Sequence, residues 1–312
     1  MKHLVCGSYI PANGLTEAQL RAIDFGKITH VFVAFSVLEK QADTDFYVPV
    51  VSEGVADGIR LLQQEIKRQN ANCRVVLSIG GAFADFFCPA VRTGENRRTF
   101  AEACAALCED YSLDGIDLDW EFPGIPHCGV MACEHCVHDF TLLCRVLRET
   151  LGEKLLTSAM GSDHWNRLEN DELRGLLDYV NVMTYDMADT DHSAMTLTQN
   201  AMEGWLAQGY RPEQLLLGVP FYGRSTDESY NWMGYHTAME AVRAGKAQRL
   251  HTDNQDYIVF ADGAKLGLDF PESIHKKVRY IQQKGFGGIF CWQELTDRDG
   301  ELRRAMAALL DA

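Results

Sequence analysis

Three acidic residues alternate with apolar residues in a short segment near the middle of the chain. Asp117, Asp119 and Glu121 lie in the sequence LDGIDLDWEFPG, which spans residues 113–124. On a β-strand the three acids would share one face, with neighbouring Cα atoms roughly 6.6 Å apart. Carboxylates this close cannot all be ionised in a partly dry site, so at least one should hold a proton with a raised pKa. A carboxyl of this kind can serve as a general acid.

The position of these acids along the strand predicts different tasks for them. If the strand belongs to a barrel, its apolar face packs against the outer helices and the acids point into the interior. Glu121, the last of the three, would then lie at the C-terminal mouth, where barrel enzymes place their chemistry. Asp119 would lie one step deeper and could exchange hydrogen bonds with Glu121 or Asp117. Asp114 has the opposite parity and is expected to do structural work where the strand begins. An amphipathic strand on the surface is the alternative interpretation of this alternation of acidic and apolar residues.

Short β-branched runs alternate with helical patterns along the whole chain, which is typical of repeated βα units around a parallel sheet. Strands are predicted at residues 4–9, 29–36, 74–80, 115–121, 155–160, 179–185, 214–221 and 287–292. Helical patterns between them cover residues 55–69, 97–111, 140–151 and 197–208. Eight buried strands with helical crossovers in 312 residues indicate a (β/α)8 TIM barrel. A doubly wound sheet is the second candidate, because a strand count from one sequence can err by one or two.

One connection does not fit the regular βα pattern. Residues 224–270 hold a helical piece at 238–243 and a strand-like piece at 257–260, but no clean crossover. We interpret this segment as a small insertion between the seventh strand and the following helix. No repeat, low-complexity tract or linker marks a second domain, so residues 1–312 are expected to form a single catalytic domain.

Composition excludes several classes of partner. The chain has 29 Lys and Arg against 44 Asp and Glu, a net charge of −15, which repels nucleic acid and anionic membrane surfaces. No apolar run approaches the roughly 20 residues of a membrane span. The first seven residues lead into a strand-like segment without a signal-peptide pattern, which predicts a cytoplasmic protein, or a secreted one if the sequence was trimmed.

The acidic segment resembles the signature of a known enzyme family. Asp114, Asp117, Asp119 and Glu121 reproduce the D-x-x-D-x-D-x-E pattern of the family 18 glycoside hydrolases, the chitinases and related enzymes. Other segments resemble family motifs in the same order: residues 78–81 (SIGG), 183–186 (MTYD), 218–224 (GVPFYGR) and 287–292 (GGIFCW). The resemblance therefore spans nearly the whole chain.

The resemblance implies a retaining hydrolysis assisted by the substrate, which must carry N-acetylglucosamine. Glu121 would protonate the glycosidic oxygen while the acetamido oxygen attacks the anomeric carbon. Asp119 would orient the acetamido group, with Asp117 behind it to accept or release a shared proton. Tyr185 would donate its hydroxyl to the acetamido oxygen. No metal or organic cofactor is implied, and the expected partner is an N-acetylglucosamine oligosaccharide.

Further residues are assigned to binding or to the frame of the site. Substrate contacts are expected from Asp186, Trp292, Met183, Tyr9, Phe35, Tyr222 and Arg224. Gly80 and Gly81 are expected to allow a close backbone approach, and Ser78 to make a structural hydrogen bond. The family also tends to carry cis non-proline peptides at matching strand ends, which makes Ala34–Phe35, Glu121–Phe122 and Trp292–Gln293 candidates.

The loop after the acidic segment departs from the family. Among ten cysteines in the chain, Cys128, Cys133 and Cys136 have the spacing C-x4-C-x2-C with interleaved histidines, which could bind zinc. The loop lacks a second C-x-x-C or a spaced histidine pair, so we expect free, reduced thiols and no metal. Cys6, Cys73 and Cys291 lie in or beside strand-like runs and are expected to act as small hydrophobic residues. The loop should help to shape the cleft.

Three functions compete at this point. The first is a chitinase or chitooligosaccharide hydrolase. The second is an endo-β-N-acetylglucosaminidase acting on glycoprotein glycans or peptidoglycan, against which MTYD weighs modestly. The third is a non-catalytic sugar-binding protein, against which the presence of Glu121, Asp119 and Tyr185 weighs. The short insertion predicts a shallow cleft and therefore short soluble oligosaccharides rather than crystalline chitin.

Overall fold

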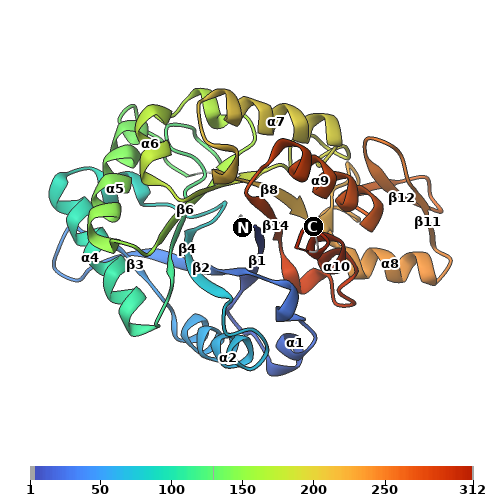
Figure 1. The fold of residues 1–312 in the computed structure, drawn as a ribbon, viewed down its shortest axis with the longest axis horizontal. Coiled ribbons are helices and arrows are strands. Elements are labelled where there is room, and N and C mark those ends of the chain that lie inside the picture. Colours follow the sequence, from blue (N-terminus) through green and yellow to red (C-terminus); the bar gives the residue numbers. More distant parts are fainter. Residues whose placement is uncertain (1–3, 129, 311–312) are drawn as a thin grey trace.

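Eight parallel strands form a closed barrel with helices around it (Figure 1). The structure is a computed structural model that describes residues 4–128 and 130–310. In their order around the barrel the strands are β1 (Val5–Pro11), β14 (Gly288–Trp292), β8 (Leu215–Pro220), β7 (Tyr179–Met183), β6 (Leu155–Gly161), β5 (Gly115–Asp119), β4 (Arg74–Gly80) and β2 (His30–Lys40). β1 pairs with both β2 and β14, which closes the sheet. The (β/α)8 prediction is confirmed, and the open doubly wound sheet is excluded.

The helices lie on the outside of this barrel. They are α1 (Glu17–Arg21), α2 (Glu53–Gln69), α3 (Phe87–Val91), α4 (Gly94–Asp110), α5 (Cys136–Leu151), α6 (Asn170–Leu176), α7 (Met195–Ala207), α9 (Pro271–Lys284) and α10 (Glu301–Ala307). Single 3₁₀ turns are η1 (Phe25–Lys27), η2 (His164–Asn166), η3 (Pro212–Gln214) and η4 (Glu294–Thr296). The four predicted helical patterns coincide with α2, α4, α5 and α7 to within a few residues. Two of these helices begin at a capping hydroxyl, Ser52 for α2 and Thr93 for α4.

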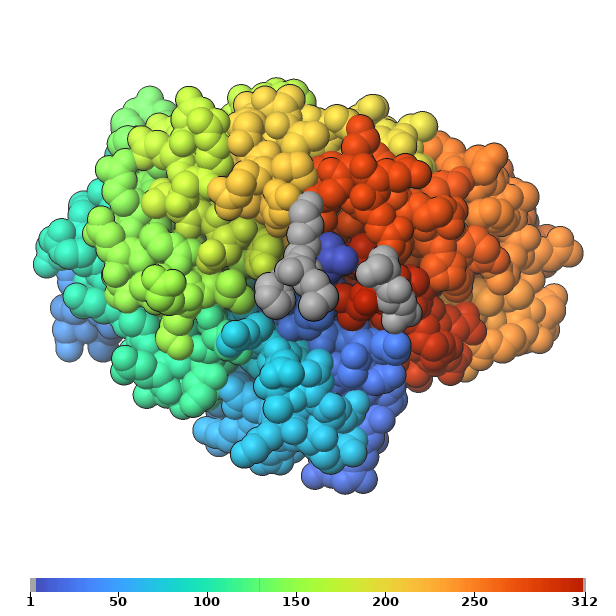
Figure 2. Space-filling view, in the orientation of Figure 1, coloured from blue at the N-terminus to red at the C-terminus, as the bar shows by residue number. Residues whose placement is uncertain are grey.

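The segment after the seventh barrel strand, β8, forms a small unit beside the barrel. After β9 (Tyr222–Gly223) and β10 (Met233–Gly234), helix α8 (Tyr235–Arg243) leads to the antiparallel strands β11 (Ala247–Leu250), β12 (Asp256–Phe260) and β13 (Lys265–Leu268). Figures 1 and 2 show this orange segment at one end of the molecule, next to α9 and α10.

Strand β11 was not predicted, because three of its four residues are exposed and no alternation of apolar and polar residues marks it. The treatment of residues 1–312 as one domain stays a prediction, and residues 1–3, 129 and 311–312 lie outside the described part. Another strand, β3 (Tyr47–Val50), pairs antiparallel with the end of β2.

Two apolar clusters hold the fold together. The larger one lies between the sheet and the helices and includes Ile116, Leu118 and Trp120, the apolar residues that alternate with the acids. The smaller one fills the barrel itself with side chains such as Phe32 and Phe290. Burial of apolar surface on both sides of the strands stabilises the barrel and fixes which face of each strand points inward.

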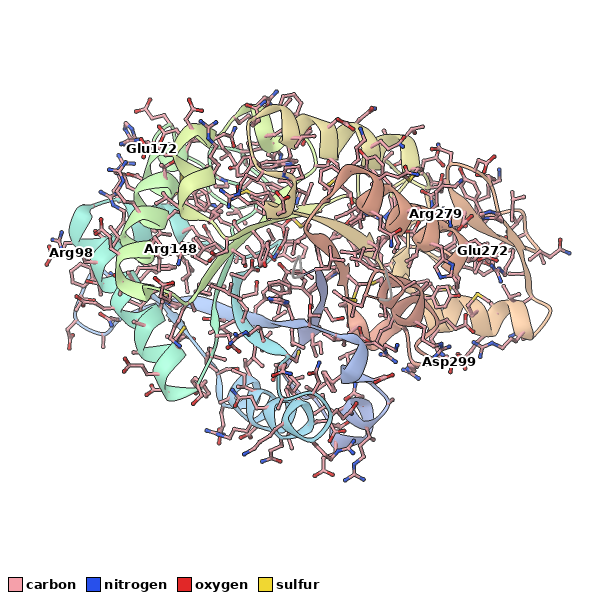
Figure 3. All side chains as sticks on the ribbon, viewed as in Figure 1. Arg98, Arg148, Glu172, Glu272, Arg279 and Asp299 are labelled. Atoms are coloured by element: carbon pink, nitrogen blue, oxygen red, sulfur yellow. A yellow bond between two sulfur atoms is a disulfide. The ribbon has the colours of Figure 1, made fainter. Side chains whose placement is uncertain are left out.

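Charged side chains lie mainly at the periphery. Arg98, Glu172 and Asp299, labelled in Figure 3, lie at the outer rim of the molecule. Within the described residues, no helix is both long enough and apolar enough to cross a bilayer.

Candidate active site

Strand β5 places two of the predicted acids inside the barrel. Asp117 and Asp119 are 0% and 4% exposed, on the face opposite Ile116 and Leu118. The strand ends at Asp119, two residues earlier than predicted, because its last backbone partners are Gly80 on β4 and Ser158 on β6. Glu121 therefore follows the strand in a bend at the C-terminal end of the barrel.

Asp117 is surrounded by hydrogen-bond donors from four other strands. Its Oδ2 accepts from the hydroxyls of Tyr9 (2.8 Å) and Ser78 (2.7 Å). Its Oδ1 accepts from the Thr157 hydroxyl (2.6 Å) and the Asn181 amide (3.1 Å). Burial raises the pKa of Asp117, and these four donors act against that rise. Asp117 therefore lies rigidly at the bottom of the site, and both of its carboxylate oxygens already accept hydrogen bonds.

Asp119 lies between Asp117 and the cleft. Burial raises its pKa well above the ordinary value, and the charges of Glu121 and Asp117 add to the rise. Its Oδ1 is buried and has no hydrogen-bond partner among the described residues. The hydrogen bond expected between Asp119 and Asp117 or Glu121 is likewise not present in the described part of the chain. The donors around Asp117 explain the missing bond to that residue, because they already occupy both of its oxygens.

Glu121 is the acid nearest the cleft mouth. Burial raises its pKa to about 7, and the negative charge of Asp186 contributes. The side chain is 13% exposed, and its Oε2 lies 3.9 Å from Nε2 of His127 in the following loop. At neutral pH Glu121 is therefore divided between its protonated and ionised forms, as a residue that both gives and takes a proton should be.

Tyr185 and Asp186 lie just after β7, beyond Thr184, and face the same cleft. Burial raises the pKa of Tyr185 well above its ordinary value, with the charges of Asp119 and Glu121 in support. Its hydroxyl therefore stays protonated and can donate. Asp186 behaves in the opposite way. Burial alone would raise its pKa, but His192, Tyr222 and Arg224 together lower it.

Contacts explain the ionised state of Asp186. The Tyr222 hydroxyl donates to Oδ2 (2.7 Å) and the Arg224 guanidinium to Oδ1 (2.8 Å). Arg224 also donates to Asn231 (2.9 Å) and lies over the ring of Trp232, 4.2 Å from its centroid. Tyr222 is 4% exposed and lies behind Asp186 rather than on the cleft surface. The structure gives Tyr222 a supporting contact with Asp186, and its predicted substrate contact stays a prediction.

Aromatic rings form one wall of the cleft. Trp292, at the end of β14, stacks on Phe35 with ring centroids 5.5 Å apart, and Tyr9 meets it edge-on at 6.0 Å. The Tyr9 hydroxyl is already engaged with Asp117, so only its ring remains to face a ligand. The cleft has a volume of about 560 Å³, and its lining also includes Met183, Asp119, Glu121, Tyr185, Asp186 and Arg224. An apolar ring wall opposite acids suits a pyranose, which has apolar faces and a polar edge.

Comparison with known proteins identifies the family. The model of the glycosyl hydrolases family 18 matches residues 7–297. The chain belongs to this family. Its relatives include Chitinase 1 of Aphanocladium album, 28% identical over 75% of this chain and 64% of the relative, so the chain spans less than two thirds of that protein. The class V chitinase of Arabidopsis thaliana is 25% identical over 95% of this chain and 88% of the relative.

Solved structures show the same fold. A family 18 chitinase from Cycas revoluta in complex with (GlcNAc)3 has a TM-score of 0.85 at 24% identity, with 98% of this chain and 99% of that chain covered. A class V chitinase from tobacco in complex with NAG4 has a TM-score of 0.86 at 21% identity, and the match covers 99% of both chains. These likenesses support the barrel assignment.

The remaining family 18 motif residues hold the frame of the site. Gly80 has φ 125°, and a Cβ there would lie 2.1 Å from the carbonyl oxygen of Asp119, so another residue does not fit. Gly81 packs against the Phe35 ring, and its amide donates to the Asp119 carbonyl (2.9 Å). Asp114 accepts from Arg74 and from the Val75 amide, both at 2.7 Å, and ties β4 to β5 as expected. All three proposed cis peptides are present: Ala34–Phe35, Glu121–Phe122 and Trp292–Gln293.

Several lining residues were not predicted. His127 was considered only as part of a possible zinc loop, yet the structure places it beside Glu121. His164 packs on Phe122 with centroids 4.0 Å apart, and Trp232 stacks on Tyr222 at 5.0 Å. These residues lie in loops or in the insertion, where no period or spacing marks them. The sequence shows only that Trp232 is a tryptophan, whereas the structure shows that its side chain is 56% exposed on the cleft.

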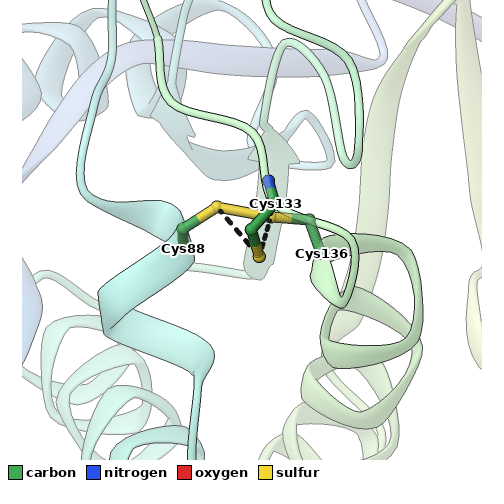
Figure 4. Close-up of side chains that lie close together, drawn as sticks. All are labelled: Cys88, Cys133 and Cys136. Carbon is green, nitrogen blue, oxygen red and sulfur yellow. Dashed lines mark hydrogen bonds between the residues drawn. A yellow bond between two sulfur atoms is a disulfide. The ribbon is translucent and has the colours of Figure 1, made fainter.

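The prediction of which cysteines lie together was wrong for one of the three residues. Cys128 is exposed on the cleft, while Cys133 and Cys136 lie next to Cys88 of α3, which the sequence did not connect with them (Figure 4). Cys88 and Cys136 form a disulfide, so the expectation of free thiols fails for Cys136. Cys6, Cys73 and Cys291 are buried free thiols, and burial raises the pKa of each. The reducing compartment expected from the sequence stays a prediction.

Proposed function

We propose that this chain is a retaining glycosidase that cleaves β-1,4-linked N-acetylglucosamine oligomers, with the substrate's own acetamido oxygen as nucleophile. The observation that carries the proposal is the division of protonation among the cleft acids. The pKa of Glu121 is raised to about 7, that of Asp119 is raised well above its ordinary value, and that of Asp186 is lowered. In the unliganded cleft Glu121 is thus ready to transfer a proton, while the pKa values of its neighbours are shifted in opposite directions.

None of these acids is a suitable protein nucleophile. A carboxyl with a strongly raised pKa, such as Asp119, carries a proton and attacks poorly. Both oxygens of Asp186 accept hydrogen bonds, one of them from the cationic Arg224. Asp117 is buried beneath the cleft and surrounded by donors. A nucleophile supplied by the substrate resolves this shortage, as in the substrate-assisted class of glycosidases.

The reaction then proceeds in two steps. Glu121 gives its proton to the glycosidic oxygen as the C1–O bond breaks, and the acetamido carbonyl oxygen forms a bond to C1. Tyr185 and Asp119 hold the acetamido group, the former as a donor to its oxygen. Water next attacks C1, the ionised Glu121 takes the water proton, and the C1–oxygen bond of the ring intermediate breaks. Two inversions at C1 give net retention.

Short soluble oligomers are the proposed form of the substrate. The cleft of about 560 Å³ holds a few sugar units, and Trp232 and Phe83 extend it with exposed rings (56% and 81%). The unit at residues 224–270 is short, which favours an open groove over a deep tunnel. The oligomers bound by the Cycas and tobacco chitinases are of this chemical class. The net charge of −15 argues against nucleic acid and anionic membranes as partners.

A product assay tests this proposal. Chitotetraose and crystalline chitin are compared with a glycoprotein glycan and a muropeptide, which would be the substrates of the second candidate, an endo-β-N-acetylglucosaminidase. The first product should be the β-anomer by NMR, and fully de-N-acetylated chitotetraose should resist cleavage. Glu121→Gln should lose at least about 10²-fold in rate, the scale of a missing general acid. Equal turnover of the de-N-acetylated oligomer would rule out the acetamido nucleophile.

A further inference from the structure

Three sulfur atoms meet at the outer end of the loop that follows β5 (Figure 4). Cys88 belongs to α3, Cys136 is the first residue of α5, and Cys133 lies in the turn just before it. Cys133 Sγ lies 3.0 Å from Cys136 Sγ and 3.7 Å from Cys88 Sγ. We propose that, in the reduced protein, these three cysteines bind one Zn²⁺ ion.

The third cysteine is the main argument for a metal. A disulfide between Cys88 and Cys136 uses two sulfurs and gives no role to Cys133, whose sulfur nevertheless lies against both. A metal ion would use all three. Cys133 and Cys136 also have the C-x-x-C spacing of zinc sites, and thiolates are among the ligands that Zn²⁺ prefers.

The surroundings place hydrogen-bond donors and a positive charge against these sulfurs, which suits thiolate ligands of a metal. Cys136 lies at the N-terminus of the 16-residue helix α5, where exposed backbone N–H groups stabilise negative charge. The Cys133 backbone N–H donates to Cys136 Sγ (3.2 Å), and the Arg92 guanidinium donates to Cys133 Sγ (3.5 Å). Three thiolates with one Zn²⁺ carry a net charge of −1, which the positive charge of Arg92 offsets.

The sulfur positions also suit a tetrahedral ion. With Zn–S bonds of about 2.3 Å, tetrahedral geometry separates the sulfurs by roughly 3.8 Å. Cys88 and Cys133 already lie at 3.7 Å, and only Cys136 would have to move away from the other two. Among the described residues the cluster offers these three ligand atoms, within 4.8 Å of one another. Water would take the fourth position.

Disulfide and metal are two alternative ways to join the same segments. A dithiol or phosphine reductant transfers two electrons to the Cys88–Cys136 bond, and two protons complete the two thiols. Zn²⁺ then displaces one proton from each of the three cysteines. Either link would tie α3 to the start of α5 and so fix the far end of the loop that carries Ile125 and His127 to the cleft.

Metal analysis of the full chain tests this site independently of any hydrolase activity. The reduced protein is equilibrated with Zn²⁺ without oxygen, and bound metal is counted by mass spectrometry. We expect one ion per chain, protection of three thiols from alkylation, and sulfur-to-metal charge-transfer absorption when Cd²⁺ replaces Zn²⁺. Cys133→Ser should weaken zinc binding at least about 100-fold, whereas the matched control Cys128→Ser, in the same loop but outside the cluster, should bind like the unmodified chain.

Two results would overturn the site. One is a reduced chain that binds no Zn²⁺ at micromolar free metal while circular dichroism shows it to be folded. The other is undiminished stoichiometry and affinity in Cys133→Ser, which would place any bound zinc elsewhere.

Discussion

The pH dependence of hydrolysis should follow the protonation of Glu121. Burial, with help from the charge of Asp186, raises the pKa of Glu121 from 4.5 to about 7. This change favours the protonated form by roughly 3 kcal/mol. At pH 7 about half of the molecules then carry the acid proton, against roughly 0.3% for a glutamate at its ordinary pKa. Since the proton donor must be protonated, kcat/KM should fall about tenfold for each pH unit above 7.

Replacing Asp186 by Asn tests the cause of this raised pKa. The substitution removes the negative charge that destabilises ionised Glu121 and leaves the cation Arg224 without its partner, so both effects lower the pKa of Glu121. The alkaline limb of the kcat/KM profile should move to lower pH. Burial should still keep its midpoint above the ordinary pKa of a glutamate. The readout is the midpoint of the limb on chitotetraose, because the level of activity will also fall. Asp171→Asn, with a side chain 91% exposed on α6, is the matched control.

The reasoning would be refuted by a profile of the unmodified chain that stays flat to pH 9. It would also be refuted if Asp186→Asn and Asp171→Asn gave the same midpoint. In the first case Glu121 would not be the titrating proton donor. In the second case, the charge of Asp186 would not affect the pKa of Glu121.

Three further variants probe separate parts of the structure. Asp119→Asn should lower kcat at least about 10²-fold, measured on chitotetraose, because an amide cannot release a proton when positive charge develops on the acetamido group in the transition state. Unchanged kcat would contradict this role. Trp292→Ala should raise KM much more than it lowers kcat, since it removes a binding surface, and a selective loss of kcat would argue otherwise. Lys277→Ala leaves the buried Asp269, now 2.6 Å from the Lys277 ammonium, without its charge partner and should cost about 3–5 kcal/mol in urea unfolding, whereas a cost below about 1 kcal/mol would show that the pair is not needed.

The barrel and its acidic strand could be predicted because they obey local rules. Eight apolar runs with the length of strands, separated by helical periods, allow few other folds. The two-residue period of β5 fixed the inward direction of Asp117 and Asp119, since the apolar residues between them must meet the helices. The end of β5 was missed because strand pairing depends on β4 and β6, which lie 39–40 residues away.

Contacts between distant segments could not be predicted in the same way. Asp117 gains its donors from β1, β4, β6 and β7, and only the closed barrel brings these strands together. Likewise, Cys88 joins Cys133 and Cys136 across more than 40 residues, whereas the spacing in the sequence suggested Cys128. Trp232 reaches the cleft from a loop whose course follows no period.

The environments of the acids, more than their number, give this cleft its chemistry. Asp117 is held by four donors, burial and the charges of its neighbours raise the pKa of Asp119, and contacts with His192, Tyr222 and Arg224 lower the pKa of Asp186. The pKa of Glu121 is raised to about 7. A double-displacement reaction needs one residue that donates a proton in the first step and removes one in the second, which is easiest when its pKa lies near the working pH. Neighbours that also titrated near pH 7 in the unliganded cleft would compete for that proton, so the shifts of their pKa values are as necessary to the proposed reaction as Glu121 itself.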